Sequence, residues 1–548
     1  MNRKYFDRDI SKLTSSPFGI FVDQAGYTPD SIKTAVMPFK CSEFTVIDKD
    51  EKTVFSGKTK LFGYDESSGD TVYTADLSQL TAKGTYRVCA DGRTSARFTI
   101  SDDVYDKVLY DTSKAFYYLR CGCGLDEKYA GTYHHLPCHC DPAVLWEDKS
   151  TLIDVKGGWH DAGDYGRYVT AGACACAHLL YAYKLFPKVF DRLKLNIPEK
   201  GMPDILSEIK YELEWLMKMQ RSDGGVYHKV TTMLHAPFVM PEDDKEQLII
   251  FPVSSMATAD FAAAAALAGS IYKNFDTDFA DRLIRAAEKS VAWLDSNPDF
   301  IGFENPEGCN TGGYYEKDDY SNRYWAYAEM YSLTGERKYH DKMKALMSKG
   351  FPLTELGYWE IGGLGSLAYI LTDRPRDEQL YKQITDAFSG HGEHLKGLSD
   401  RCGYGTAMSK EYYGWGSNML VMKNAMIFAI NDLICGDKVS KKYARRQLDY
   451  LLGTNPLGIS YVTGTGEYRT NNPHLRPAFA DGIDECIPGM VAGGPNGRPA
   501  DPYAEEVIPK DTPPMKCYAD DAASYSLNEI TIYWNSPAVF VIAYLSDK

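Results

Sequence analysis

Residues 157–166 read Gly-Gly-Trp-His-Asp-Ala-Gly-Asp-Tyr-Gly and stand just before an apolar run over 168–185. The run predicts a buried helix, and the glycines predict a turn that leads into it. Asp161 and Asp164 are three residues apart, so on a turn or a first helical turn both carboxylates can face the same way. Paired carboxylates are costly unless they hold water, a metal or a developing cation, whereas aspartates at a helix start are common caps. Both interpretations are open at this point.

The composition is that of a folded, acidic protein. A length of 548 residues predicts at least two domains. A hydrophobic share of 44% and a charged share of 25% argue against disorder. The net charge of -15, with no basic block, argues against nucleic acid or an anionic membrane as a partner. Aromatic residues make up 13% of the chain, which suits either stacking on sugar rings or the filling of a large core.

The sequence has no window of about 18 apolar residues, so we expect no membrane-spanning segment. Residues 1–9 carry basic side chains but no apolar stretch follows them, which does not fit a secretory signal. The 13 cysteines are odd in number and scattered, as is typical of thiols in a reducing compartment. We therefore expect a cytoplasmic protein, or a secreted one if a leader has been removed. The oligomeric state is left open.

The hydrophobic pattern changes near residue 102 from period two to helical. Alternation in stretches such as 43–46 and 85–88, separated by turn residues, predicts a small immunoglobulin-like β-sandwich. After residue 102, about a dozen apolar-periodic segments predict a helical bundle, a solenoid or a closed double ring of helices, and the lack of a fixed repeat disfavours the solenoid. The segments lie at 104–119, 168–186, 203–219, 255–273, 279–294, 322–334, 338–349, 356–372, 376–388, 416–435, 440–452 and 528–545.

The end of the chain brings a third carboxylate. Residues 453–527 are rich in proline and glycine but also in aromatic side chains, which predicts an ordered excursion that builds one wall of a site. The segment 525–530 then reads Tyr-Ser-Leu-Asn-Glu-Ile, and we place Glu529 in the first turn of an apolar helix. Glu529 is either a helix cap or an acid. Two acidic sites far apart in sequence are what the hydrolysis of a glycosidic bond requires.

The segments 157–165 and 525–530 resemble the two signatures of family 9 glycoside hydrolases, the inverting β-1,4-glucanases, and the resemblance covers nearly the whole chain. It implies an all-β immunoglobulin-like sandwich at 17–101 and an all-α (α/α)6 barrel at 102–548. It also implies that Asp164 is the general base, Asp161 its partner on the same water, and Glu529 the general acid. An inverting enzyme holds its acid and base about 6.5–9.5 Å apart, and burial of Glu529 should raise its pKa.

Further binding residues follow from the same resemblance. His474 and Arg476, in Asn-Pro-His-Leu-Arg-Pro at 472–477, match the family's segment around the cleaved bond, although this chain has Leu475 where the family often has His or Asp. Tyr525, one turn before Glu529, is a predicted sugar contact. Trp159 either packs beneath the aspartate loop or forms a platform for a sugar ring, and packing is the favoured interpretation.

The resemblance also implies a structural zinc ion. Two thiols and two imidazoles suit tetrahedral zinc, and four protein ligands would close the site to chemistry. Its role would be to fix the loop that holds Asp161. Other cysteines and histidines crowd the same stretch, namely Cys123, His134, His135 and Cys140. The predicted ligands are Cys121, Cys138, His139 and His160.

A calcium site of the family corresponds to residues 311–323 of this chain. Ser321 and Asn322 stand where the family has an acidic pair, and fewer carboxylates bind a hard cation less well. We therefore expect calcium to be absent, unless another acid nearby compensates. No organic cofactor is expected.

We expect an inverting hydrolase of β-1,4-glucosidic bonds, of cellulase or cellodextrinase type, that acts on cello-oligosaccharides or soluble β-glucan. The alternative within the family is an exo-β-glucosaminidase that acts on chitosan oligomers. A non-catalytic carbohydrate-binding protein would be expected to lack one of the three carboxylates, and all three are present. A zinc hydrolase would need an open coordination position. The choice between endo and exo action and the preferred chain length are left open.

Overall fold

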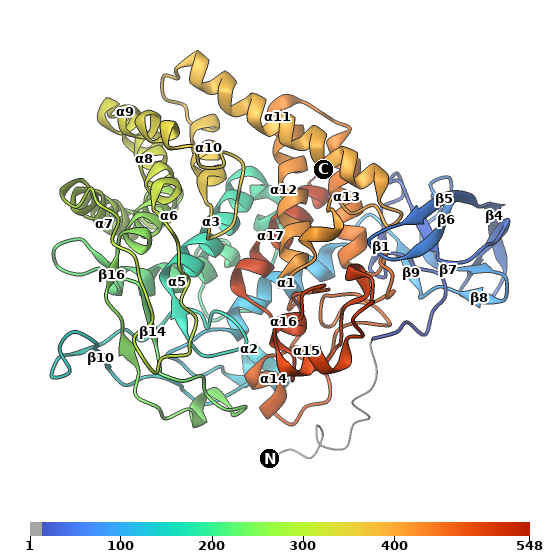
Figure 1. Cartoon of the computed structure of the whole chain (residues 1–548), viewed down its shortest axis with the longest axis horizontal. Helices are drawn as coiled ribbons and strands as arrows, with labels where there is room; N and C mark the ends of the chain where they lie inside the picture. The colour runs from blue at the N-terminus through green and yellow to red at the C-terminus, as the bar shows by residue number, and fades with distance from the viewer. Residues whose placement is uncertain (1–13, 548) are drawn as a thin grey trace. The chain divides into compact units, whose positions relative to one another are not determined.

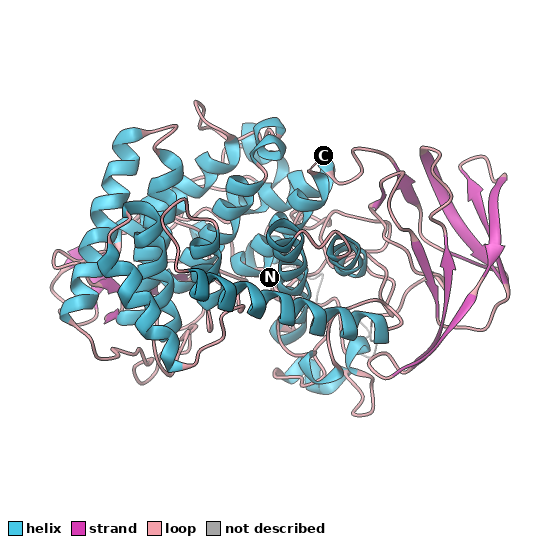
Figure 2. Ribbon diagram, turned by 90° about the horizontal axis from the view of Figure 1, so that it is seen from above, coloured by secondary structure: helices cyan, strands magenta, loops and turns pink. Residues whose placement is uncertain are grey.

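The computed structural model describes residues 14–547, so residues 1–9, which do not fit a secretory signal, lie outside the described residues. The chain forms two compact units, one made of Met1–Ala115 with Gly392–Lys548 and the other of Phe116–His391. Many of the strands lie in the N-terminal part, which is blue in Figure 1, and helices dominate the rest of the chain; Figure 2 draws strands in magenta and helices in cyan.

The N-terminal part is a sandwich of two sheets. One sheet has the strand order β1-β9-β7-β3-β4 with β8 paired to β7, and the other has the order β2-β6-β5. The inward residues of both sheets, such as Val46, Val88 and Ala75, form one apolar core. Alternation of buried and exposed residues along each strand explains this arrangement, because successive side chains point to opposite faces. The strands are β1 (Gly26–Tyr27), β2 (Thr34–Met37), β3 (Glu43–Asp48), β4 (Thr53–Lys58), β5 (Lys60–Asp65), β6 (Asp70–Asp76), β7 (Gly84–Ala90), β8 (Arg93–Thr94) and β9 (Phe98–Ile100).

Polar contacts join the sandwich to the C-terminal part of the same unit. The side-chain amide of Gln24 donates to the carbonyls of Gly458 at 3.0 Å and Tyr468 at 2.9 Å, and its oxygen accepts from the Tyr468 amide. The Asp65 carboxylate accepts from the Gly403 amide at 2.7 Å. Gln24 and Asp65 are both buried, so these contacts are well shielded from water.

In the first unit, helix α12 packs against α13 and α17. α17 is almost wholly buried because most of its residues are apolar. α13 carries charged residues along one side and keeps that side polar. The helices with residues in this unit are α1 (Asp106–Tyr118) and α11 (Glu378–Arg401), which both continue into the second unit, and α12 (Ser417–Cys435), α13 (Ser440–Leu451), α14 (Arg476–Ala480), α15 (Pro502–Val507), α16 (Tyr525–Asn528) and α17 (Ile532–Ser546).

In the second unit, helix α6 is central and packs against α3, α7 and α8. Its residues 262–266 are all alanine and all fully buried, and such small side chains let neighbouring helices approach closely. The helices that lie wholly in this unit are α2 (Glu127–Ala130), α3 (Val169–Leu185), α4 (Pro187–Arg192), α5 (Asp204–Lys218), α6 (Ser255–Tyr272), α7 (Thr277–Ser296), α8 (Tyr320–Thr334), α9 (Arg337–Leu346) and α10 (Gly362–Ile370).

The second unit also holds a small sheet that positions the aspartate loop. Its order is β11-β10-β15-β14-β12, beside a separate pair β13-β16. Strand β12 follows the loop directly and pairs antiparallel with β14, so that Tyr168 lies opposite Lys229. The strands are β10 (Ala143–Leu145), β11 (Leu152–Ile153), β12 (Arg167–Tyr168), β13 (Val226–Tyr227), β14 (Lys229–Thr231), β15 (Ile249–Ile250) and β16 (Val253–Ser254).

The placement of Glu529 in the first turn of the last helix is wrong. The short helix α16 ends at Asn528, and Glu529 follows it with extended backbone, at φ -65 and ψ 158. Helix α17 begins at Ile532, because the Thr531 side chain accepts from the Trp534 amide and caps it. A backbone break between the two helices is therefore hidden inside a single apolar run.

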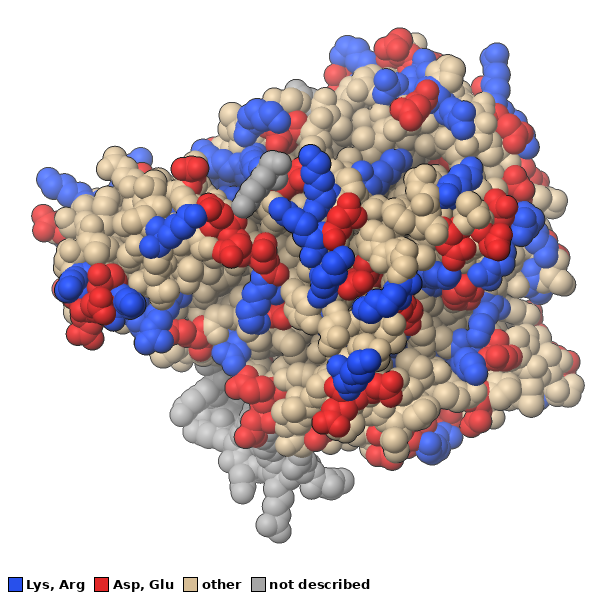
Figure 3. All heavy atoms as spheres, turned by 180° about the vertical axis from the view of Figure 1, so that it is seen from behind, with Lys and Arg blue, Asp and Glu red and all other residues tan. Residues whose placement is uncertain are grey.

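Among the described residues, no helix has the length and apolar character needed to span a bilayer. On the face drawn in Figure 3, basic and acidic side chains are interspersed.

Candidate functional site

The aspartate loop, residues 157–166, is held in a tight conformation. Gly157 and Gly158 have φ values of 115 and 78, in the left-handed region that favours glycine. The His160 amide donates to the Leu119 carbonyl at 2.7 Å, and the Gly158 carbonyl accepts from the Cys121 amide at 2.7 Å. Residues 119–121 therefore fix the loop from one side.

Trp159 supports the loop from below. Its side chain is 1% exposed and its ring lies 4.8 Å from that of Phe116. The indole N–H donates to Glu208 at 2.9 Å, and the backbone N–H of Trp159 donates to Glu212 at 2.6 Å. The Arg120 guanidinium pairs with Glu208 at 2.9 Å. The prediction that Trp159 packs beneath the loop is confirmed.

Asp161 is almost fully buried, at 1% exposure. The Tyr314 hydroxyl donates to its Oδ2, and its Oδ1 has no hydrogen-bond partner among the described residues. Burial raises the pKa of Asp161 well above its ordinary value; the Tyr314 hydrogen bond opposes this rise, and the charge of Asp164 adds to it. The two aspartates are therefore close enough to interact electrostatically.

Asp164 has its orientation fixed by groups on both sides of the loop. Its Oδ2 accepts from the Gly166 amide at 3.1 Å and from the Tyr168 hydroxyl at 3.2 Å. His235 places its Nδ1 3.4 Å from the same oxygen. Asp164 is 6% exposed, so its carboxylate is largely shielded from water.

The four predicted metal ligands come together. One donor atom from each of Cys121, Cys138, His139 and His160 lies within 4.8 Å of the others. His139 Nδ1 and His160 Nε2 are buried and have no hydrogen-bond partner among the described residues. The other nitrogen of His139 lies 3.2 Å from Asp244 Oδ2, which is the outer contact that usually orients a metal-bound imidazole. The donor set fits a closed, four-coordinate metal.

The pKa of the Cys121 thiol also fits a role as a metal ligand. Burial alone would raise the pKa of the Cys121 thiol, but the hydrogen bond from Cys138 and the positive charge of Arg167 outweigh it, so the pKa lies well below its ordinary value. A thiolate is the form that binds metal.

The segment around Glu529 is built separately, in the first unit. Its backbone pairs with that of His474, whose amide donates to the Asn528 carbonyl at 2.8 Å. The His474 and Tyr525 rings lie 6.0 Å apart, and His474 Nδ1 lies 2.6 Å from the Ala522 carbonyl oxygen. The structure thus brings Glu529, His474 and Tyr525 together, and Arg476 opens helix α14 next to them with 6% exposure.

A buried carboxylate, Asp501, holds this segment in place. It accepts from the Ser524 hydroxyl at 2.7 Å and from the Ser526 amide at 2.9 Å. Ser524 in turn caps helix α16 by accepting from the Leu527 amide. Glu529, one residue after the helix, is half-buried.

The stretch predicted to replace a calcium site is a hydrogen-bonded cluster. The Asn322 side-chain amide donates to Asp260 at 3.0 Å and to Glu316 at 3.3 Å. Burial, together with the nearby charge of Asp260, raises the pKa of Glu316 to about 10. Asn322 Oδ1 and Asp260 Oδ2 are buried here without a hydrogen-bond partner among the described residues, so the absence of calcium stays a prediction.

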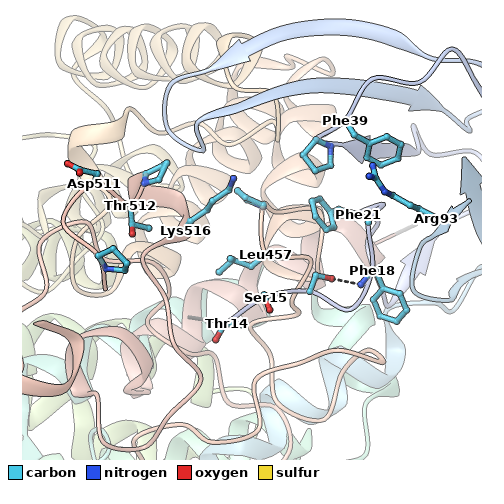
Figure 4. Close-up of a pocket in the computed structure, with 16 residues that line it drawn as sticks. Thr14, Ser15, Phe18, Phe21, Phe39, Arg93, Leu457, Asp511, Thr512 and Lys516 are labelled. Carbon is cyan, nitrogen blue, oxygen red and sulfur yellow. Dashed lines mark hydrogen bonds between the residues drawn. The ribbon is translucent and has the colours of Figure 1, made fainter. Parts of the chain in front are cut away.

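The first unit also has a cavity of about 800 Å³, drawn in Figure 4. It is lined by residues of the sandwich, such as Phe39 and Arg93, and of the C-terminal part, such as Leu457 and Lys516. None of the predicted catalytic or sugar-binding residues lines it. We therefore do not assign the reaction to this cavity.

Three residues next to the aspartates escaped the sequence analysis. Tyr314 lies in the stretch that corresponds to the family's calcium site, and its φ of 49 is unusual for a residue other than glycine. The hydroxyl of Tyr168 and the imidazole of His235 reach Asp164 from a strand and a loop. A Gly-Gly pair directly before Tyr314 was the available signal, because it marks close backbone approach.

Comparisons with known proteins agree with this arrangement. A family model described as glycosyl hydrolase family 9 matches residues 105–542, and one described as a cellulase N-terminal ig-like domain matches residues 17–95. A cellodextrinase of Butyrivibrio fibrisolvens is 45% identical over 96% of this chain and 99% of its own length. An endoglucanase D of Acetivibrio thermocellus is 34% identical over 96% of this chain and 83% of its own. A crystal structure of a thermostable endoglucanase from Alicyclobacillus acidocaldarius, a single mutant, has a TM-score of 0.92 at 33% identity and covers 97% of this chain and 100% of its own.

Proposed function

Because the chain belongs to glycosyl hydrolase family 9, we propose that it cleaves β-1,4-glucosidic bonds of cello-oligosaccharides or soluble β-glucan with inversion. The observation that carries the proposal is the aspartate loop, where two buried carboxylates share one small site. The similarity to a cellodextrinase over nearly the full length of both chains supports short glucans as substrates. The comparisons do not favour the glucosaminidase alternative, since the reported relatives are named for action on cellodextrins or glucans.

In this mechanism Asp164 is the general base. Its Oδ2 is oriented by Gly166 and Tyr168, and the carboxyl takes a proton from the attacking water. Asp161 holds the same water through its Oδ1, since Tyr314 already occupies its Oδ2. An ionised Asp164 is the form that can accept the proton. The proton transfer from water therefore needs Asp164 to be charged.

Glu529 is the general acid that protonates the leaving oxygen. Its backbone lies between two anchored segments, because His474 pairs with it and the Gly493 amide donates to its carbonyl at 2.8 Å. His474, Arg476 and Tyr525 bind the sugar on either side of the cleaved bond. The shared local framework of these residues supports a common role.

The cluster of Cys121, Cys138, His139 and His160 would hold a zinc ion, for which two sulfurs and two nitrogens are the usual ligands. With four protein ligands, the ion would stabilise the fold without taking part in the reaction. It would tie His160, and so the neighbouring Asp161, to the segment that begins at Cys121. We also place the boundary between the sandwich (17–101) and the helical domain (102–548) after strand β9, which ends at Ile100.

The proposal is tested with a ladder of cello-oligosaccharides and chitosan oligomers, with product anomers followed by NMR. We expect the α-anomer first from the β-linked glucan, and no release of glucosamine. Asp164→Asn and Glu529→Gln should each lower turnover by about 10²- to 10⁴-fold, as loss of general acid–base catalysis does. Asp148→Asn, at an exposed carboxylate bonded within its own turn, is the control and should be fully active. Appearance of the β-anomer first, or full activity of Asp164→Asn, would contradict the mechanism.

A further inference from the structure

Lys229 is a fully buried lysine on strand β14. Its ammonium donates to Asn305 Oδ1 at 2.7 Å, to Thr311 Oγ1 at 2.9 Å and to the Gly312 carbonyl at 2.7 Å. These three acceptors use all three donors of an ammonium group. The lysine therefore fastens the strand to the segment 305–312.

That segment leads directly to the aspartates. The Gly312 amide donates to the Tyr168 hydroxyl oxygen at 3.0 Å, and the Tyr168 hydroxyl donates to Asp164 Oδ2 at 3.2 Å. Because the oxygen of Tyr168 accepts from Gly312, its single proton is left for Asp164. Two residues later, the Tyr314 hydroxyl donates to Asp161.

The approach of Gly312 to Tyr168 is close. A Cβ at Gly312 would lie 3.1 Å from the Tyr168 ring, so a larger residue would displace either the segment or the ring. The neighbouring His228 secures the next residue, since its Nε2 donates to the Gly313 carbonyl at 2.8 Å. The segment 311–314 is thus held by two consecutive side chains, and it touches both carboxyl groups through tyrosines.

We propose that Lys229 is a positioning residue for the hydrolysis: its ammonium holds the segment 311–314 where Tyr168 directs its proton to Asp164 and Tyr314 reaches Asp161. The inference rests on the proposed function, in which Asp164 is the base. Lys229 itself touches neither substrate nor water in this role.

The surroundings explain why a charged group is kept here. The ammonium lies 4.6 Å from the centre of the Phe251 ring, 5.4 Å from that of Phe303 and 5.6 Å from that of Tyr168, all within reach of cation–π attraction. Burial lowers the pKa of Lys229 to about 8, and the facing acidic groups, Cys309 and Asp164, oppose the decrease. A buried charge that is costly to keep is more easily explained by a role at the aspartates than by packing alone.

The first experiment measures kcat and KM of Lys229→Met and Tyr168→Phe on a cello-oligosaccharide. We expect kcat to fall by up to about 100-fold in Lys229→Met, as small displacements of catalytic groups cause, with KM unchanged. Tyr168→Phe removes only the hydroxyl link and should show the same kind of loss. The double variant should lose no more than the larger single loss, because both changes break one chain of contacts.

The matched control is Lys33→Met. Lys33 is also fully buried, and its ammonium donates to the carbonyls of Pro29 and Ser31 in the sandwich, at 2.6 and 2.9 Å. This variant should lower the melting temperature and leave kcat as it is. A loss of kcat in Lys33→Met equal to that in Lys229→Met would show that general destabilisation explains both.

Normal kcat in Lys229→Met, or losses that simply add in the double variant, would overturn the inference. Should Lys229→Met fail to fold, Tyr168→Phe decides alone, and normal turnover of that variant would overturn the proposed route. Failure of the proposed function gives a different result, since Asp164→Asn would then remain active. If Asp164→Asn is inactive and Lys229→Met is fully active, the role of Lys229 is refuted and the proposed function stands.

Discussion

Replacing Tyr314 with phenylalanine would remove a single hydroxyl group from the aspartate pair. The ring would keep its contacts, since it lies 4.7 Å from the Tyr168 ring and 4.7 Å from the Tyr358 ring. The lost hydrogen bond reaches the buried carboxyl of Asp161, and such bonds to charged groups contribute about 1.5–3 kcal/mol. At 1.36 kcal/mol for each factor of ten in rate, kcat should fall about 10- to 160-fold.

The loss should depend on pH. The Tyr314 hydroxyl lowers the pKa of Asp161, against the larger effect of burial, which raises it. Without the hydroxyl the pKa rises further, and less of Asp161 is ionised at low pH. The acid side of the pH–rate profile should therefore move to higher pH in Tyr314→Phe.

The assay is initial-rate hydrolysis of cellotetraose from pH 4 to pH 9, with the melting temperature measured in parallel. The matched control is Tyr181→Phe, which removes a tyrosine hydroxyl that donates to the buried Glu329 carboxyl at 2.6 Å, between helices α3 and α8. Tyr181→Phe should lower stability and keep kcat. An unchanged kcat in Tyr314→Phe, or an equal loss in the control, would refute the reasoning.

Three further predictions concern the metal, calcium and a buried carboxyl. Cys138→Ser should lower the melting temperature and release bound zinc before it changes turnover; an unchanged melting temperature would remove the metal assignment. Adding EGTA and then excess calcium should leave the melting temperature unchanged, since Ser321 and Asn322 bring no carboxylate to the corresponding stretch, and a calcium-dependent rise would contradict this. Burial raises the pKa of Glu329 from 4.5 to about 7, so the folded state binds the proton more tightly and wild-type stability falls as pH rises through this range. Glu329→Gln lacks this fall, and its stability relative to the wild type should rise by about 3 kcal/mol between pH 4.5 and pH 8 in denaturant titrations.

The division of the chain into strands and helices followed from the hydrophobic period, whereas the (α/α)6 barrel was implied by the resemblance to family 9 glycoside hydrolases. The strand pattern up to Ile100 and the helical pattern after it are confirmed, and the matches to an ig-like domain and to the helical family 9 domain bear out the sandwich followed by an (α/α)6 barrel. The spacing of hydrophobic residues shows which face of a helix or strand is buried. The sandwich and the helical domain are both stabilised by burying such faces. Helices α3 and α6 lie within two residues of the predicted segments for that reason.

At Glu529 the spacing of hydrophobic residues does not predict where the last helix begins. An apolar run continues through the break between α16 and α17, and a capping threonine decides the break. The residue type of Thr531 does not show that it caps a helix, because threonine also occurs within helices. Its role depends on the local backbone, which the apolar pattern does not record.

The candidate site was predicted in part. The predicted metal ligands, among them Cys121 and His160, came from the resemblance to the family, since other cysteines and histidines crowd the same stretch, and the structure brings all four together. Tyr314 and Lys229 were missed, because tyrosine and lysine occur throughout the chain and only the folded backbone places them beside the aspartates. The roles of Asp161, Asp164 and Glu529 stay predictions for the variants above.

The contacts of Gln24 have a consequence for anyone who wishes to shorten this enzyme. One side chain of the sandwich satisfies two carbonyls and one amide of the stretch 458–468, all in a place shielded from water. An enzyme cut down to its helices would lose these hydrogen bonds, together with the one that the Gly403 amide donates to Asp65, and would expose this backbone to water. The stretch that then frays is the one that leads to His474 and Arg476. Grafting this β-module onto a different helical partner would therefore succeed only if the recipient loops were carried over with it.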